Sequence, residues 1–196
     1  MNARIEKYLT AYNAIQFLGW SASLLCLFWD FGYAFAGISL MQTLSIAEIF
    51  HAYKKWSRSP LLYTFLQIAA RLLILYLLYK LLMFSIFHPL PYLVKTFYIL
   101  FGAWSVAEII RYGYYLSLLL KKENKTLTWL RYSAFIICYP LGLAAEMYII
   151  YLFYRYASYQ YIRTLLILVW ILYAIAFPML YLHLLKQRRK KLIHNS

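Results

Sequence analysis

Six long apolar stretches separated by short polar breaks make up most of the sequence. They cover residues 8–29, 33–53, 61–83, 92–120, 129–153 and 162–186. Each is at least as long as the roughly 20 residues that a helix needs to cross the hydrocarbon core of a bilayer. An open sheet would leave backbone groups unpaired in lipid. The pattern therefore predicts an all-α, polytopic membrane protein with six transmembrane helices, in a single domain over residues 1–196.

Basic residues gather at alternate ends of these stretches. One side would hold thirteen of them: Arg4, Lys7, Lys54, Lys55, Arg58, Lys121, Lys122, Lys125, Lys186, Arg188, Arg189, Lys190 and Lys191. The opposite side would hold only Lys80, Lys95, Arg155 and Arg163. The positive-inside rule then places both termini in the cytoplasm. The first stretch is too long for the core of a signal peptide, so we interpret it as the first membrane helix.

Composition supports a membrane protein and excludes several other classes. The chain is 65% hydrophobic and 13% charged, whereas soluble domains are about half apolar and about a quarter charged. The net charge of +14 does not indicate a nucleic-acid partner, because the basic residues lie at the ends of apolar stretches. Cys26 and Cys138 both lie inside apolar stretches, so neither a disulfide framework nor a metal site is expected. We expect no cofactor, and a solvated basic tail after residue 185.

Charged residues inside the apolar stretches are the strongest functional signal. Glu48, Glu108 and Glu146 lie within them, and Arg71, Arg111 and Arg131 lie within them or at their edges. Each charge in hydrocarbon costs roughly 2.5–3.5 kcal/mol even on lenient insertion scales. Such residues normally face a protein interior or a wet cavity. We therefore predict a polar cavity in the cytosolic half of the helix bundle.

The sequence spacing of the polar residues places pairs of them on the same face of a helix. Gln67 and Arg71 are four residues apart, and Tyr139 and Glu146 are seven apart, so each pair lies on one face. Between the latter two, Pro140 removes a backbone hydrogen bond and Gly142 leaves room for close approach. A phenol, a proline, a glycine and a carboxyl within eight residues of a membrane helix indicate a candidate active-site segment.

Other interpretations of these residues remain open at this stage. Glu108 with Arg111, and Glu48 with Arg71, could be plain ion pairs that hold helices together. Intramembrane acids and arginines also line the paths of small-solute or proton transporters and channels, although no internal repeat supports a transporter. A non-catalytic scaffold is a third possibility. A cysteine phosphatase is excluded, since neither cysteine is followed six positions later by arginine.

Several blocks of the sequence, in order, resemble one known family. The segment Leu130-Arg131-Tyr132 through Tyr139-Pro140-Leu141-Gly142 to Glu146 resembles the signature of the 3-hydroxyacyl-CoA dehydratases of fatty-acid elongation, once called protein tyrosine phosphatase-like. Earlier blocks are also similar to that family: Tyr12-Asn13 with Gly19-Trp20, Glu48 with His51, Gln67 with Arg71, and Trp104-Ser105 with Glu108 through Tyr112 and Tyr115. The resemblance covers about residues 8–155. The chain departs from the family pattern at Lys55, where a glycine is usual, and at Ala70, where a serine is usual.

The resemblance implies a six-helix membrane lyase that converts a 3-hydroxyacyl-CoA into a trans-2-enoyl-CoA. Its catalytic pair corresponds to Tyr139 and Glu146. We favour Glu146 as the base and Tyr139 as the acid, although the sequence also permits the reverse. The family's other polar positions would support the site or position the substrate, and they correspond to Arg131, Arg111, Glu108, Tyr112, Gln67, Arg71, Glu48 and Gly142.

The expected substrate also implies a place for its CoA phosphates. Six basic residues at the cytosolic mouth could bind them, and these are Lys54, Lys55, Arg58, Lys121, Lys122 and Lys125. The alternative is that these residues only determine topology. Besides acyl-CoA and membrane lipid, other elongation-cycle enzymes are candidate partners. The expected location is the endoplasmic reticulum in a eukaryote or the inner membrane in a bacterium.

Overall fold

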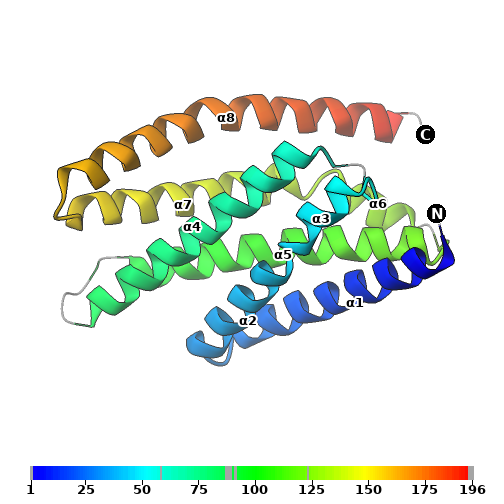
Figure 1. Ribbon diagram of the computed structural model, residues 1–196, viewed down its shortest axis with the longest axis horizontal. Coiled ribbons are helices and arrows are strands. Elements are labelled where there is room, and N and C mark those ends of the chain that lie inside the picture. Colours follow the sequence, from blue (N-terminus) through cyan, green and yellow to red (C-terminus); the bar gives the residue numbers. More distant parts are fainter. Residues whose placement is uncertain (1, 58, 87–89, 91, 123, 194–196) are drawn as a thin grey trace.

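The protein is a bundle of long α-helices in a computed structural model that describes residues 2–57, 59–86, 90, 92–122 and 124–193 (Figure 1). No strand occurs among these residues. The helices are α1 (Ala3–Cys26), α2 (Phe31–Leu44), α3 (Ala47–Tyr53), α4 (Leu61–Ser85), α5 (Leu93–Leu119), α6 (Lys125–Arg131), α7 (Phe135–Tyr156) and α8 (Gln160–Ile193). The predicted all-α class is confirmed.

Each predicted stretch is helical, and polar side chains cap several of the helix starts. The side chain of Asp30 accepts a hydrogen bond from the backbone of Tyr33 at the start of α2, and Asn124 accepts one from Leu127 at the start of α6. Such caps satisfy donors that the first helical turn leaves free. Two stretches are broken in a way that the apolar pattern does not predict: α3 follows α2 after a turn at Ser45, and α7 follows α6 after a turn at Ser133.

Five segments of the described chain are long and apolar enough to cross a membrane. They are Phe31–Tyr53, Leu61–Ser85, Leu93–Leu119, Lys125–Tyr156 and Gln160–Lys191, which correspond to the second to sixth predicted stretches. Helix α1 spans 24 residues but does not reach the same apolarity, and Asn13 and Gln16 lie in its middle. A membrane protein is therefore supported, whereas six spans and cytoplasmic termini stay predictions.

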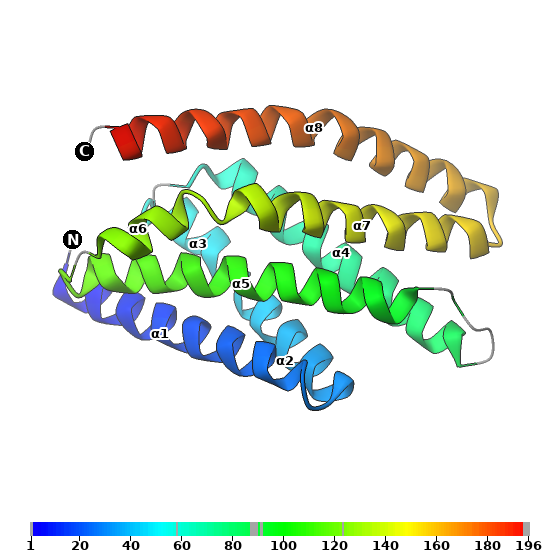
Figure 2. The same cartoon turned by 180° about the vertical axis from the view of Figure 1, so that it is seen from behind.

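Helix α5 is the centre of the bundle. It packs against α1 on one side and α7 on the other, while the backbone of α4 lies against α7, α3 and α2. Buried apolar side chains of α4 and α5 belong to the same core. Large aromatic side chains fill the core, including Trp20 of α1 and Phe97, Phe101 and Trp104 of α5. Helix α8 lies on the outside, mainly against α7, and the view from behind shows it as the outermost layer (Figure 2).

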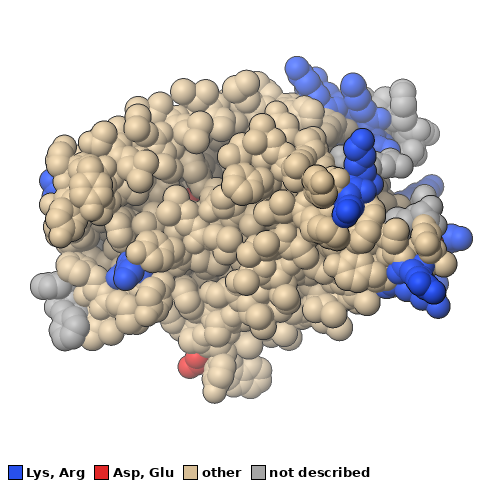
Figure 3. All heavy atoms as spheres, viewed as in Figure 1, with Lys and Arg blue, Asp and Glu red and all other residues tan. Residues whose placement is uncertain are grey.

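Both termini lie at the same end of the bundle, together with α3 and α6 (Figure 1). In the space-filling view, lysine and arginine side chains gather at this end, and the middle of the visible face is uncharged (Figure 3). The basic tail continues α8 as a helix, and Arg188 donates a hydrogen bond to the hydroxyl of Ser133 at 3.1 Å. Lys186, Arg189, Lys190 and Lys191 are exposed, in keeping with the predicted solvated tail, whereas Arg188 contacts the turn between α6 and α7.

Candidate active site

Four charged side chains from three helices form a continuous ion-pair ladder, made of Glu48, Arg111, Glu108 and Arg71. Arg111 donates two hydrogen bonds to the carboxylate of Glu48, both at 2.8 Å. Its Nε lies 2.6 Å from Oε2 of Glu108. The other Glu108 oxygen pairs with Arg71. Two acids and two bases cancel, so no unpaired charge is left within the ladder.

Polar side chains from α1, α2 and α5 extend the ladder away from Arg71. The hydroxyl of Tyr112 donates to Glu48 at 2.5 Å and accepts from Arg111 at 2.7 Å. The hydroxyl of Ser45 lies 3.3 Å from that of Tyr112, and the amide of Gln16 donates to Ser45 at 3.4 Å. This network lies at the Glu48 end of the ladder. It supplies hydrogen bonds to the Glu48 carboxylate, as burial of a charge requires.

A polar cavity of about 110 Å³ lies beside the other end of the ladder. Its wall comes from α4, α5, α6, α7 and the loop before α4, and the lining residues are Ser59, Gln67, Arg71, Ala107, Glu108, Arg111, Tyr115, Arg131 and Tyr139. The Arg71–Glu108 pair joins α4 to α5 beside the cavity. The predicted polar cavity is present, and Arg71, Arg111 and Arg131 line it together with Tyr139.

Tyr139 and Glu146 are placed differently with respect to this cavity. Tyr139 is half-buried and lines it, whereas Glu146 lies about 10 Å farther along α7 by helical rise and does not belong to its wall. Arg71 lies within electrostatic range of both the phenol and the carboxyl. The two predicted catalytic groups therefore lie on the same helix and have Arg71 as a common charged neighbour.

The Glu146 carboxyl lies beside aromatic side chains of two other helices. The indole nitrogen of Trp104 in α5 donates to Oε1 of Glu146 at 3.0 Å. The side chain of Tyr173 in α8 also lies near this carboxyl. The guanidinium carbon of Arg71 lies 5.1 Å from the centroid of the Trp104 ring. Trp104 thus connects the end of the ion-pair ladder to the carboxyl.

The structure brings together most of the residues that the sequence singled out. Six of the ten candidate catalytic and supporting residues line the cavity: Tyr139, Arg131, Arg111, Glu108, Gln67 and Arg71. Glu48 and Tyr112 belong to the network behind it. A Cβ added to Gly142 would lie 3.8 Å from the Trp104 ring, which is ordinary van der Waals distance. The suggested pairing of Glu48 with Arg71 is wrong, since Arg71 pairs with Glu108 and Glu48 pairs with Arg111.

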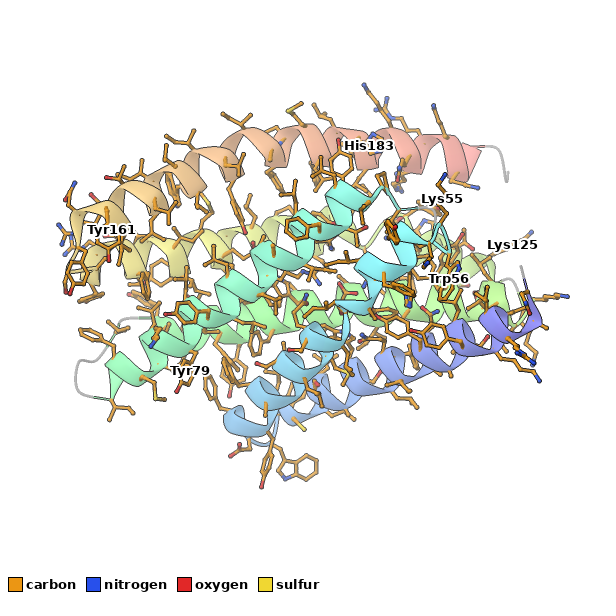
Figure 4. All side chains as sticks on the ribbon, viewed as in Figure 1. Lys55, Trp56, Tyr79, Lys125, Tyr161 and His183 are labelled. Carbon is orange, nitrogen blue, oxygen red and sulfur yellow. The ribbon has the colours of Figure 1, made fainter. Side chains whose placement is uncertain are left out.

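The candidate phosphate-binding lysines Lys55 and Lys125 lie at the same end of the bundle as the termini, α3 and α6 (Figure 1 and Figure 4). Lys54 and Lys55 follow α3, and the loop after them reaches the cavity wall at Ser59. Lys121 and Lys122 are exposed in the turn between α5 and α6. Arg58 lies outside the described residues.

Sequence reasoning gave no role to Trp104 and Tyr173. Trp104 was named only as part of a block that resembles the dehydratase family. Tyr173 is one of 22 tyrosines in the chain. The spacing of Trp104 and Glu108, four residues apart on α5, could have indicated that Trp104 faces the ladder. Within the described residues, no group of three or more His, Cys, Asp or Glu side chains could hold a metal ion.

The chain is similar to one protein family and to several curated proteins. The family model described as protein tyrosine phosphatase-like protein, PTPLA, matches residues 42–194. A Schizosaccharomyces pombe protein named a probable very-long-chain (3R)-3-hydroxyacyl-CoA dehydratase is 34% identical over 94% of this chain and 92% of its own length. A Caenorhabditis elegans protein named as the same dehydratase is 32% identical over 95% of this chain and 94% of its own. Human very-long-chain (3R)-3-hydroxyacyl-CoA dehydratase 2 is 28% identical over 96% of this chain and 82% of its own. No solved structure matches the chain significantly.

The ladder predicts that Glu108→Gln strongly destabilises the protein. The substitution removes the carboxylate shared by Arg71 and Arg111 and leaves buried cations without full compensation. Breaking a buried pair in this way costs about 3–5 kcal/mol. Thermal unfolding of the purified protein in detergent measures the loss. Glu6→Gln in the first turn of α1 is the control and should cost no more than about 1 kcal/mol; equal melting temperatures for the two variants would contradict the ladder.

Proposed function

We propose that this chain, which belongs to the protein tyrosine phosphatase-like family PTPLA, removes water from a 3-hydroxyacyl-CoA to give a trans-2-enoyl-CoA in fatty-acid elongation. The observation that carries the proposal is the similarity, over nearly the whole chain, to proteins named as very-long-chain (3R)-3-hydroxyacyl-CoA dehydratases. None of the relatives named above is described as a transporter. We therefore favour the lyase over the transport alternative.

The reaction needs one group that takes a proton and one that gives a proton. Glu146 takes the proton from the carbon beside the thioester carbonyl, and Tyr139 gives its phenolic proton to the hydroxyl on the next carbon, which leaves as water. The double bond forms between these two carbons. Return of the proton from Glu146 to Tyr139 restores both groups. Positioned side chains that transfer protons in this way accelerate reactions about 10²- to 10⁴-fold.

Arg71 and Arg131 are suited to stabilise the negative charge that develops on the thioester oxygen. Both line the cavity beside Tyr139, and Arg71 lies near both proton-transfer groups. Preorganised cations aimed at a developing oxyanion cost no reorganisation during the reaction. The ion-pair ladder holds Arg71 in place through Glu108. Its role in this mechanism is to fix that cation against α5.

The proposed topology places the site within reach of the cytosol. Six spans with both termini in the cytoplasm would put the basic end of the bundle (Figure 3) on the side where acyl-CoA is soluble. The polar cavity and its Ser59 entrance lie toward that end. The single-domain, multi-pass protein would then reside in the endoplasmic reticulum of a eukaryote or the inner membrane of a bacterium.

For the proposed reaction, we predict that Tyr139→Phe and Glu146→Gln each abolish most turnover without unfolding the protein. Each variant keeps the shape of the side chain and removes its proton-transfer group, so kcat should fall by at least about 100-fold. The kcat of each variant is measured from the conversion of a 3-hydroxyacyl-CoA to enoyl-CoA by the purified protein in detergent. The exposed Tyr98 provides the control, because Tyr98→Phe should keep wild-type turnover. Near-normal turnover in either site variant would reject the assignment.

A second prediction concerns Trp104 as the positioning partner of Glu146. Trp104→Phe keeps a ring beside Arg71 but removes the N–H that donates to the carboxyl. A hydrogen bond to a charged group contributes about 1.5–3 kcal/mol, so kcat should fall about 10- to 100-fold. KM should change little, since substrate contacts remain. A rise in KM at unchanged kcat would show that Trp104 acts in substrate binding instead.

A third prediction tests the lysines at the mouth of the cavity. Lys54→Gln combined with Lys55→Gln should raise KM for acyl-CoA at low salt and weaken the dependence of KM on salt, because screened surface charges attract CoA phosphates less. The matched control is Lys80→Gln combined with Lys95→Gln. Lys80 and Lys95 lie over tyrosine rings, as Lys54 does, but they belong to the ends of α4 and α5 that are far from the cavity. Equal effects in both pairs would exclude a phosphate role.

A further inference from the structure

One face of α7 continues beyond the proposed catalytic residues. Tyr139, Glu146, Ile150 and Tyr154 follow one another at intervals of seven, four and four residues. In a helix with 3.6 residues per turn these positions form one stripe. The stripe is polar at Tyr139 and Glu146 and becomes apolar one turn later. Whatever extends along this face from Glu146 toward the end of α7 therefore meets hydrocarbon and aromatic rings.

An apolar groove occupies this continuation, between α7 and α8. Its volume is about 180 Å³, and its lining residues are Ile150, Tyr151, Tyr154, Leu166, Ile167 and Trp170. Ile150 and Leu166 are almost fully buried and form its floor, whereas Tyr151, Ile167 and Trp170 are each 45% exposed and form its rim. No lining residue carries a charge. The groove is thus open along one side to the outer surface of the bundle.

Helix α8 aligns the groove with the proposed active site. The Trp170 indole nitrogen lies 3.4 Å from the backbone oxygen of Met147, the residue after Glu146, and donates to it. The Tyr173 side chain lies near the Glu146 carboxyl. Tyr173 and Trp170 are three residues apart, so they lie on one face of α8. The groove therefore begins about one helical turn beyond Glu146, on the side opposite Tyr139.

We propose that this groove binds the first part of the acyl tail of the substrate. The inference rests on the dehydratase function proposed above. Along the bundle the structure places exposed lysines, the arginine-lined cavity with Tyr139, then Glu146, and then the apolar groove. A 3-hydroxyacyl-CoA has the same order of chemistry: phosphates, thioester carbonyl, the two reacting carbons and a hydrocarbon tail. The order of the protein sites matches the order of the groups in one extended substrate.

The groove acts by positioning the substrate. A tail in a membrane has lipid as an equally apolar alternative, so burial in the groove supplies little net hydrophobic driving force. Its effect is to direct the tail along α7, which holds the reacting carbons between Tyr139 and Glu146. A misplacement of about 1 Å can cost 10²-fold in rate. Because the groove is open at its side, the far end of a long tail can leave it and lie in lipid.

The test compares two substrates and two neighbouring tryptophan variants. Ile167 lines the groove, whereas Leu168 is also an exposed aliphatic residue of α8 but does not line it. Ile167→Trp should fill the groove and lower kcat/KM for 3-hydroxypalmitoyl-CoA about 10- to 100-fold. It should leave 3-hydroxybutyryl-CoA unaffected, since that tail ends before the groove. Leu168→Trp should match wild type with both substrates.

A second variant distinguishes an effect on the groove from a loss of the fold. Trp170→Ala removes one wall of the groove and should also lower the ratio of long-chain to short-chain kcat/KM, while turnover of 3-hydroxybutyryl-CoA shows that the site is intact. If both Ile167→Trp and Trp170→Ala keep the wild-type ratio of long-chain to short-chain kcat/KM, the groove does not bind the acyl tail. Turnover by the wild-type protein would still support the dehydratase function. Equal loss in Leu168→Trp and Ile167→Trp would also overturn the role of the groove. A wild-type protein that dehydrates neither substrate would overturn the proposed function and this inference with it.

Discussion

The arrangement of the bundle depends on the ion-pair ladder formed by Glu48, Arg111, Glu108 and Arg71. A single charge among these apolar helices would be costly, but alternating acids and bases in contact compensate one another. The ladder joins α3, α5 and α4. Three of its members, Arg71, Glu108 and Arg111, also line the polar cavity. The charged side chains that connect the helices thus form part of the wall of that cavity.

The same ladder links the scaffold to the candidate chemistry. Arg71 ends the ladder, lines the cavity with Tyr139, and lies over the Trp104 ring. Trp104 in turn donates to Glu146. Through these contacts the Glu146 carboxyl, a candidate proton-transfer group on α7, is connected to a cation on α4. The candidate phosphate-binding lysines lie at one end of the bundle and the apolar groove lies toward the other. This order matches the order of phosphates and hydrocarbon tail in an acyl-CoA.

The helices follow from the sequence more directly than the pairing of side chains does. Long apolar stretches require helices in lipid, and the structure has helices there, with Asp30 and Asn124 capping the starts of α2 and α6. Seven-residue spacing also placed Tyr139 and Glu146 on one face. The partner of Glu48 could not be predicted, because Arg111 lies 63 residues away and the choice between Arg111 and Arg71 depends on how three helices pack. The turn at Ser45 that starts α3, and the position of Tyr173 near Glu146, likewise arise from packing between helices.

The central claim is that Tyr139 and Glu146 act on one substrate beside Arg71. The most direct measurement is an experimental structure of the Glu146→Gln variant with a 3-hydroxyacyl-CoA trapped in it. The account predicts that the hydroxyl-bearing carbon lies between residues 139 and 146, with the thioester oxygen toward Arg71 and the ion-pair ladder intact. A thioester bound outside the space shared by α4, α5 and α7, with neither side chain near the reacting carbons, would contradict it.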